Sequence, residues 1–104
     1  MDTELLQRLC RDNRIKWSLH ALKRIRERGI SAAEVLYCVM HGAIIEHYPD
    51  DRPFPSCLMN CEMTDRHLHV VLSSDGSEIT IITAYIPNDD EWENDYQTRK
   101  AAQP

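Results

Sequence analysis

Glycine is scarce in this sequence, and its scarcity excludes one large class of binding site. Three glycines occur among 104 residues, and each stands where a helix or a turn is expected to end. Loops that cradle nucleotide phosphates need several glycines close together, so that backbone N–H groups can approach the ligand. The sequence therefore contains no glycine-rich phosphate loop.

Long apolar runs are missing as well. No uncharged stretch approaches the roughly 20 apolar residues that a membrane-spanning helix needs. Residues 1–4 are acidic, and they are not followed by the basic and apolar segments of a secretory signal. We therefore expect a cytoplasmic protein with no membrane association.

The remaining composition is that of one folded domain. Hydrophobic residues make up 42% and charged residues 28% of the chain, which is ordinary for a globular protein. A chain of this length can bury one hydrophobic core without disulfides. Its four cysteines do not predict disulfides, because nothing in the sequence indicates secretion. We expect a single domain over residues 1–104.

Charge is distributed unevenly along the chain. Residues 1–30 hold eight lysines and arginines against four acidic residues, a net charge of +4. Residues 31–104 hold four against thirteen, a net charge of −9. The N-terminal third is therefore either a local anion-binding surface or a solvated helical face.

Three helices are predicted in the N-terminal part from residues that favour helix ends. They cover residues 3–12, 18–28 and 31–42. The last of them opens with a capping box of Ser31 and Glu34. The second is capped by Ser18, and its apolar side is predicted to include Leu19 and Leu22.

The second part of the chain is predicted to form mainly strands. Alternation of apolar and polar residues predicts strands at 43–48, 56–62, 67–73 and 78–85, and a last helix is predicted at 91–100. Helices followed by consecutive strands indicate an α+β fold. We expect N-terminal helices packed on a four-stranded antiparallel sheet, with a short C-terminal helix.

Two predicted turns set the register of this sheet. A two-residue turn at Asp75-Gly76 pairs Leu72 with Ile79. A similar turn at residues 64–65 pairs strands 56–62 and 67–73, with Cys61 opposite Leu68.

This register places Cys57 and Cys61 on the core face, and His67 and His69 on the other face. The separation argues against a zinc site made from these four residues, because structural zinc needs its ligands clustered.

The second helix carries the pattern most suggestive of chemistry. His20, Arg24 and Arg28 follow one another at one-turn spacing, with Lys23 beside them. Arginine binds phosphate bidentately, and histidine can transfer a proton near neutral pH. The pattern suits a phosphodiester substrate, although a salt-bridged surface with a Lys23–Glu27 pair would show the same spacing.

Five stretches resemble a known family in their order and spacing. They are Ser-Leu-His-Ala-Leu-Lys-Arg-Ile-Arg-Glu-Arg-Gly-Ile-Ser at 18–31, Gly-Ala-Ile-Ile-Glu at 42–46, Pro-Ser at 55–56, Leu-His-Val-Val at 68–71 and Ile-Thr-Ala-Tyr-Ile-Pro at 82–87. Over roughly residues 15–100 the chain resembles the bacterial family called domain of unknown function 4258.

The resemblance implies a fold and an activity. The family is grouped with RelE-like and barnase-like ribonuclease toxins, which implies helices on an antiparallel sheet. It also implies cleavage of RNA by attack of the 2′-hydroxyl, without a metal ion or another cofactor. Its members are often encoded beside small zinc-finger antitoxins, so RNA and such an antitoxin are the implied partners.

The family pattern also implies the site residues. The expected catalytic residues are His20 or His69 as general base or acid, Arg24 for the charge on the phosphate, and Tyr85 to orient or protonate. The expected substrate-binding residues are Lys23, Arg28 and Thr83.

Two other functions are compatible with the same residues. The chain would be a non-catalytic interaction module if its sheet edges or its basic helix bound a protein partner and the ribonuclease fold carried no activity. It would be a metal-binding protein if the pair His67 and His69 held an ion.

Overall fold

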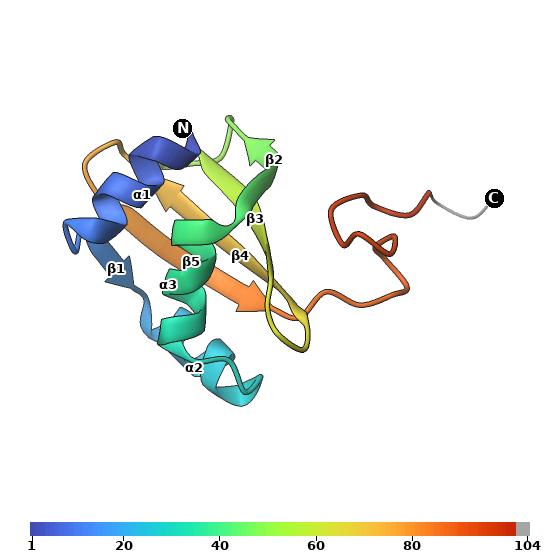
Figure 1. Cartoon of the computed structure of the whole chain (residues 1–104). Helices are drawn as coiled ribbons and strands as arrows, with labels where there is room; N and C mark the ends of the chain where they lie inside the picture. The colour runs from blue at the N-terminus through green and yellow to red at the C-terminus, as the bar shows by residue number, and fades with distance from the viewer. Residues whose placement is uncertain (102–104) are drawn as a thin grey trace.

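The computed structural model describes residues 1–101 and shows an α+β fold in which helices lie on one face of a five-stranded sheet (Figure 1). The elements are α1 (Thr3–Arg11), β1 (Ile15–Trp17), α2 (Leu19–Glu27), α3 (Ala32–His41), β2 (Ala43–Tyr48), β3 (Ser56–Glu62), β4 (His67–Ser74) and β5 (Ile79–Tyr85). The strand order is β1-β5-β4-β3-β2. Within residues 1–101, no helix is long and apolar enough to cross a membrane.

The helices begin and end where their capping residues predicted. The Ser18 hydroxyl accepts a hydrogen bond from the backbone N–H of Ala21 at 2.9 Å and so caps α2. Ser31 and Glu34 form the complete capping box of α3. Gly29, with φ 68°, takes the left-handed conformation that glycine tolerates after a helix end.

The core lies between the helices and the sheet face that the sequence predicted. Cys57 and Cys61 are buried there, and all four cysteines are free thiols. Burial raises the pKa of Cys57 to about 11, so this thiol is uncharged at neutral pH. The β3–β4 pairing agrees with the predicted register, since Cys61 lies opposite Leu68.

The predicted pairing of Leu72 with Ile79 is wrong by two residues, because Leu72 pairs with Ile81. The turn contains four residues, 75–78, and its own side chains stabilise it. The Asp75 carboxylate accepts hydrogen bonds from the backbone N–H groups of Ser77 and Glu78 at 2.9 and 3.0 Å. A shift of two residues keeps each side chain on the same face, so the core face was still predicted correctly.

The sheet has one strand more than predicted, and it is mixed. β1 pairs parallel with β5, with Ile15 opposite Ile79 and Trp17 opposite Ile81. A strand of three residues is too short to show alternation in the sequence. The parallel pairing is decided by where α1 and α2 place the segment between them.

The predicted C-terminal helix is absent from the described residues. The Asp95 carboxylate accepts hydrogen bonds from the backbone of Gln97 and Thr98, and such local bonds compete with a helix. Tyr96 has φ 55°, which a helix does not allow. We call residues 88–101 the C-terminal segment; its Trp92 is 2% exposed.

The predicted apolar side of α2 is also partly wrong. Only Ala21 and Ile25 of this helix are buried, whereas Leu19 is 86% and Leu22 40% exposed. The helix packs mainly against β5, and this contact covers a narrow stripe of its surface.

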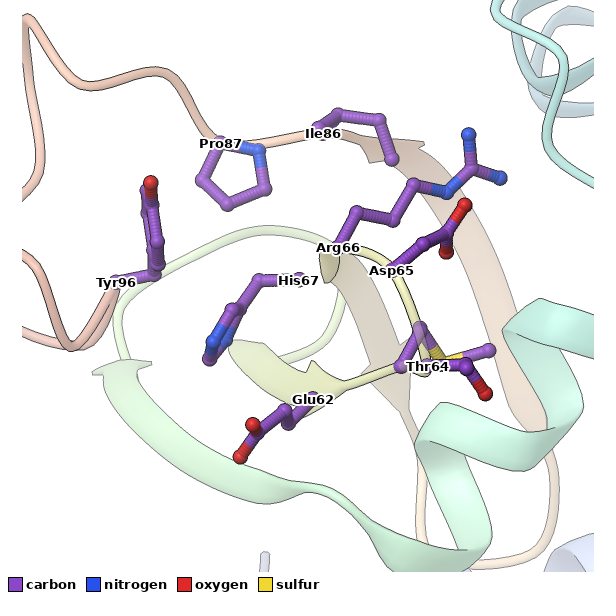
Figure 2. A pocket seen from close by; sticks show the side chains of 9 residues that line it. Glu62, Thr64, Asp65, Arg66, His67, Ile86, Pro87 and Tyr96 are labelled. Carbon is purple, nitrogen blue, oxygen red and sulfur yellow. The ribbon is translucent and has the colours of Figure 1, made fainter.

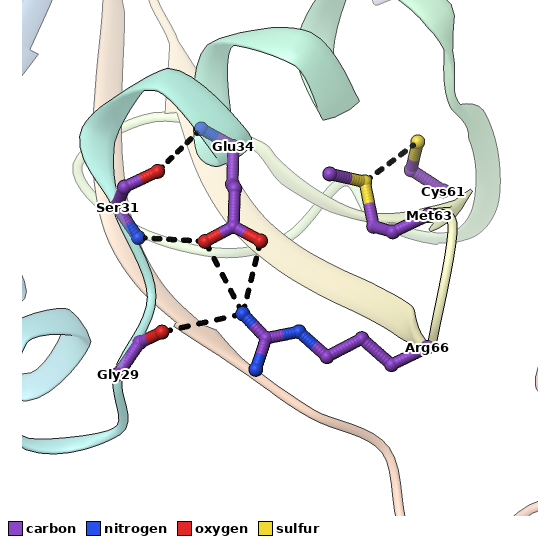
Figure 3. Close-up of polar contacts among 6 residues, drawn as sticks. All are labelled: Gly29, Ser31, Glu34, Cys61, Met63 and Arg66. Atoms are coloured by element: carbon purple, nitrogen blue, oxygen red, sulfur yellow. Dashed lines mark hydrogen bonds and ion pairs between the residues drawn. The ribbon is translucent and has the colours of Figure 1, made fainter.

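Arg66 joins the β3–β4 turn to the connection between α2 and α3 (Figure 3). Its Nη2 donates to Glu34 Oε2 at 2.9 Å and to the carbonyl oxygen of Gly29 at 3.2 Å. Gly29 follows the end of α2 and Glu34 lies in the first turn of α3, so Arg66 holds the ends of the two helices together.

We predict that Gly42→Ala destabilises the fold. A Cβ at this position would lie 2.6 Å from the Cys38 carbonyl oxygen and 2.7 Å from that of Asn60. Both are backbone atoms, so the backbone between α3 and β2 must shift, at a cost of about 3 kcal/mol. Urea denaturation should show this loss, and a matched Gly29→Ala variant, which has open space but left-handed φ, should lose only about 1 kcal/mol. A Gly42→Ala protein as stable as wild type would contradict the prediction.

Candidate active site on the open face of the sheet

A β-bulge in β5 determines which side chains reach the face away from α1 and α3, here called the open face. Val71 pairs with Thr83 and Leu72 with Ile81, so Ile82 is an extra residue in β5. Beyond the bulge, odd-numbered residues of β5 lie on the open face and even-numbered residues lie on the core face, the reverse of their arrangement before it. Ala84 is therefore buried in the core, and Thr83 and Tyr85 lie on the open face.

His69 lies beside Tyr85 on this face and is fully buried. Its Nε2 is 2.7 Å from the carbonyl oxygen of Tyr96, and its Nδ1 is 3.3 Å from the Tyr85 hydroxyl. A carbonyl oxygen only accepts hydrogen bonds, so Nε2 carries the proton. Nδ1 of the neutral ring then accepts the hydrogen bond that Tyr85 donates. Burial lowers the pKa of His69 and raises that of Tyr85, which favours this neutral pair.

The C-terminal segment buries His69. The Trp92 ring packs edge-on against the His69 ring, with centroids 4.6 Å apart. Arg99 Nε donates to Glu46 Oε2 at 2.7 Å, and its guanidinium lies 4.6 Å from the centre of the Trp92 ring. This hydrogen bond from Arg99 lowers the pKa of Glu46. The ion pair therefore fastens the segment to β2 with Trp92 beneath it.

Arg28 approaches the same end of β5 from α2. Its Nη1 donates to the Thr83 hydroxyl at 3.1 Å and to the Ala84 carbonyl oxygen at 2.8 Å. No hydrogen bond occupies Nη2 or Nε within residues 1–101, and the residue is exposed. The structure thus brings four of the predicted site residues together, and we call Arg28, Thr83, Tyr85 and His69 the Arg28 cluster.

The other three predicted residues lie apart from this cluster. His20, Lys23 and Arg24 are exposed on α2. Arg24 forms an ion pair with Glu27 at 3.3 Å, so the surface pair expected for Lys23 is made by its neighbour. In the described part of the chain, no hydrogen bond links any of the three to the Arg28 cluster.

A pocket of about 350 Å³ adjoins the cluster on the side of the β3–β4 turn. In it the His67 side chain lies between Tyr96 and Glu62 (Figure 2), and the His67 and Tyr96 rings have centroids 4.7 Å apart. Sequence reasoning missed the contacts of Trp92, Tyr96 and Arg99 with this face, because it placed all three in a helix. The sequence indicates these contacts only if residues 91–100 are taken to be non-helical.

The predicted alternative of a metal site on His67 and His69 has little support in the geometry. Both ring nitrogens of His69 are occupied by protein partners, and His67 Nδ1 contacts the Asn60 side-chain oxygen at 3.2 Å. Among residues 1–101, no group of three histidine, cysteine or acidic side chains is placed to hold a metal ion.

Comparison with known proteins gives one family. A family model described as Domain of unknown function (DUF4258) matches residues 17–86. The match includes every residue of the Arg28 cluster and ends before the C-terminal segment. No curated protein matches the chain, and no solved structure matches it.

We predict that stability falls in mild acid because of His69. Its pKa in the folded protein lies below the ordinary 6.5, so the unfolded chain binds a proton at higher pH than the folded protein does. The contribution of His69 to the free energy of unfolding should therefore decrease as the pH falls below about 6.5 and level off below its pKa in the folded protein. Chemical denaturation at several pH values measures this slope.

The slope should be shallower in His69→Gln than in the control His47→Gln, which replaces an exposed histidine and leaves the His69 ring in place. An equally steep slope in His69→Gln would show that another group is responsible.

Proposed function

We propose that this chain, which belongs to the family described as Domain of unknown function (DUF4258), is an endoribonuclease that attacks the phosphate with the neighbouring 2′-hydroxyl. The observation that supports the proposal is the Arg28 cluster. It combines an exposed guanidinium with a hydrogen-bonded tyrosine and histidine at one end of the open face. Likeness to RelE-like and barnase-like ribonuclease toxins is part of this proposal.

Arg28 binds the phosphate that is cleaved. Its Nη1 is oriented by Thr83 and Ala84, so Nη2 and Nε remain for two phosphate oxygens. A guanidinium held in this way does not have to reorganise as charge grows on the pentavalent phosphorus, which is the main source of electrostatic catalysis. Arg24 and Lys23, which precede Arg28 by about one turn of the same helix, bind a neighbouring phosphate.

Tyr85 and His69 accept the proton of the attacking hydroxyl. As the 2′-oxygen bonds to phosphorus, its proton passes to the Tyr85 oxygen, and the proton of Tyr85 passes to Nδ1 of His69. His69 is buried and acts through Tyr85, so it is a positioning and proton-holding residue. The bond from phosphorus to the 5′-oxygen breaks, and the proton held on His69 returns through Tyr85 and a water molecule to the leaving oxygen. The products are a 2′,3′-cyclic phosphate and a 5′-hydroxyl, and no step calls for a metal ion.

A second candidate function rests on the exposed leucines of α2. Leu19 and Leu22 lie on the helix that also carries Lys23 and Arg26. An apolar pair with a basic border suits an acidic, apolar protein segment. Such a partner fits a small antitoxin of the zinc-finger type, and the same surface would serve a non-catalytic interaction module.

We predict that Arg28→Ala lowers RNA cleavage about 100-fold or more, because a donor to the reacting phosphate is lost. Tyr85→Phe removes one hydroxyl from the relay and should cost at least about 100-fold. Cleavage of a mixed single-stranded RNA by the purified protein, with a chelator present and 2′,3′-cyclic ends as the readout, measures both effects. Arg26→Ala is the matched control, since Arg26 lies on the same helix and outside the cluster.

Equal rates in Arg28→Ala, Tyr85→Phe and Arg26→Ala would remove the cluster from the mechanism. If the wild-type protein leaves RNA intact, the interaction module replaces the enzyme as the proposed function.

A growth assay tests the two α2 residues that lie apart from the cluster. Expression of the wild-type chain should arrest growth. If the catalytic roles that the family pattern implies for His20 and Arg24 hold, His20→Ala and Arg24→Ala should each relieve the arrest. Losing the exposed Arg24–Glu27 ion pair costs under about 1 kcal/mol of stability, so an unchanged melting temperature separates lost activity from lost folding. Full arrest with both variants would leave proton transfer and charge stabilisation to the Arg28 cluster alone.

A further inference from the structure

A second hollow lies on the open face, at the end opposite the β3–β4 turn. Its volume is about 410 Å³. Its floor is a row of hydroxyl side chains across three strands, because Ser56 pairs with Ser73 and Ser73 with Thr80. Phe54, Pro53 and Ile82 line it with apolar surface, and Lys16, Arg52 and Asp51 line it with charge.

Phe54 and Arg52 give this hollow the two groups that hold single-stranded nucleic acids. The Phe54 side chain lines the hollow and is 44% exposed. Arg52 is exposed and has no acidic partner within residues 1–101, whereas Lys16 is paired with Glu78 at 2.8 Å. Exposed aromatic rings stack on nucleobases, and nearby cations bind the phosphates that link them.

The distance along the sheet between the hollow and the Arg28 cluster suits two neighbouring nucleotides. Its floor row contains Ser73, and the next row along the open face contains Val71 and Thr83. Two residues along a strand span about 7 Å. Ile82, in the wall of the hollow, directly precedes Thr83, to which Arg28 is bonded. An RNA chain whose phosphate lies on Arg28 therefore places an adjoining nucleotide at the β5 side of the hollow that Phe54 lines.

Polar groups in the hollow favour bases with amino groups. The Asp51 carboxylate accepts a hydrogen bond from the Ser56 hydroxyl and has a second oxygen to accept from a ligand. Carboxylates accept from exocyclic amino groups such as that of cytosine. Uracil has no amino group, and its one donor on that edge, N3–H, is flanked by two carbonyl oxygens that the carboxylate repels. The hydroxyls of Ser73 and Thr80, which make no side-chain hydrogen bond in the described residues, can donate or accept.

We infer that this hollow is a base-binding subsite for single-stranded RNA, in which Phe54 stacks on the base, Arg52 contacts its phosphate and Asp51 selects against uracil. The inference rests on the proposed function, since that function makes RNA the ligand of the open face. It adds a sequence preference, which neither the Arg28 cluster nor the basic face of α2 supplies.

Binding of nucleoside 5′-monophosphates tests the subsite without requiring cleavage. We expect adenosine, cytidine and guanosine monophosphates to shift the backbone amide signals of Ser73 and Thr80 in nuclear magnetic resonance titrations, and uridine monophosphate to bind more weakly. Phe54→Ala should weaken binding about tenfold. Tyr37→Ala is the matched control, because Tyr37 is 47% exposed and lies outside the hollow. Asp51→Asn should remove the discrimination against uracil, because an amide both donates and accepts.

The results separate the subsite from the proposed function. Nucleotide binding that depends on Phe54, in a protein that cleaves no RNA, supports the subsite and overturns the ribonuclease. Cleavage of RNA with binding and sequence preference unchanged in Phe54→Ala and Asp51→Asn overturns the subsite and leaves the ribonuclease. Equal weakening in Phe54→Ala and Tyr37→Ala also overturns the subsite, because the effect would not be specific to the hollow.

Discussion

The bulge at Ile82 is the constraint on which the candidate site depends. Without an extra residue in β5, the side chains of Thr83 and Tyr85 would point toward α1 and α3. With it, Ala84 fits the core and Tyr85 reaches His69. Bulges are common beside active sites because they redirect side chains without ending the strand. The hydrogen bond from Arg28 to Thr83 also requires this change of face.

The buried His69 links the sheet to the end of the chain. Its two hydrogen bonds join Tyr85 in β5 to the Tyr96 carbonyl in the C-terminal segment, and Trp92 closes the space beside it. A buried polar ring is stable only when both nitrogens have partners. The C-terminal segment therefore completes the hydrogen bonding of His69, although the matched family region ends at residue 86.

The two candidate binding regions of the open face lie at opposite ends of its strands. In the proposed function, the Arg28 cluster supplies charge and proton transfer at one end of the face, and the hollow with Phe54 supplies apolar contact at the other. A net charge of −5 is compatible with the polyanionic ligand that we propose, since phosphate contacts depend on the cations near the bound RNA and not on the total charge. The acidic C-terminal segment contacts β2 through Arg99 and β4 through Trp92 and Tyr96, and Arg28 remains exposed.

The sequence by itself determined the features that depend on neighbours a few residues apart. Ser18, Ser31 with Glu34, and Gly29 set the helix ends, and strict alternation set the β3–β4 register and the core face. Helix spacing singled out Arg28 for a site, and the family pattern added His69, Thr83 and Tyr85. Only the tertiary structure decided that these four residues meet.

The parallel β1, the bulge at Ile82 and the non-helical C-terminal segment all arise from contacts between residues far apart in the chain. Local sequence patterns do not predict such contacts. The free energy that favours these contacts comes from packing and from hydrogen bonding of buried polar groups after the helices and strands have formed.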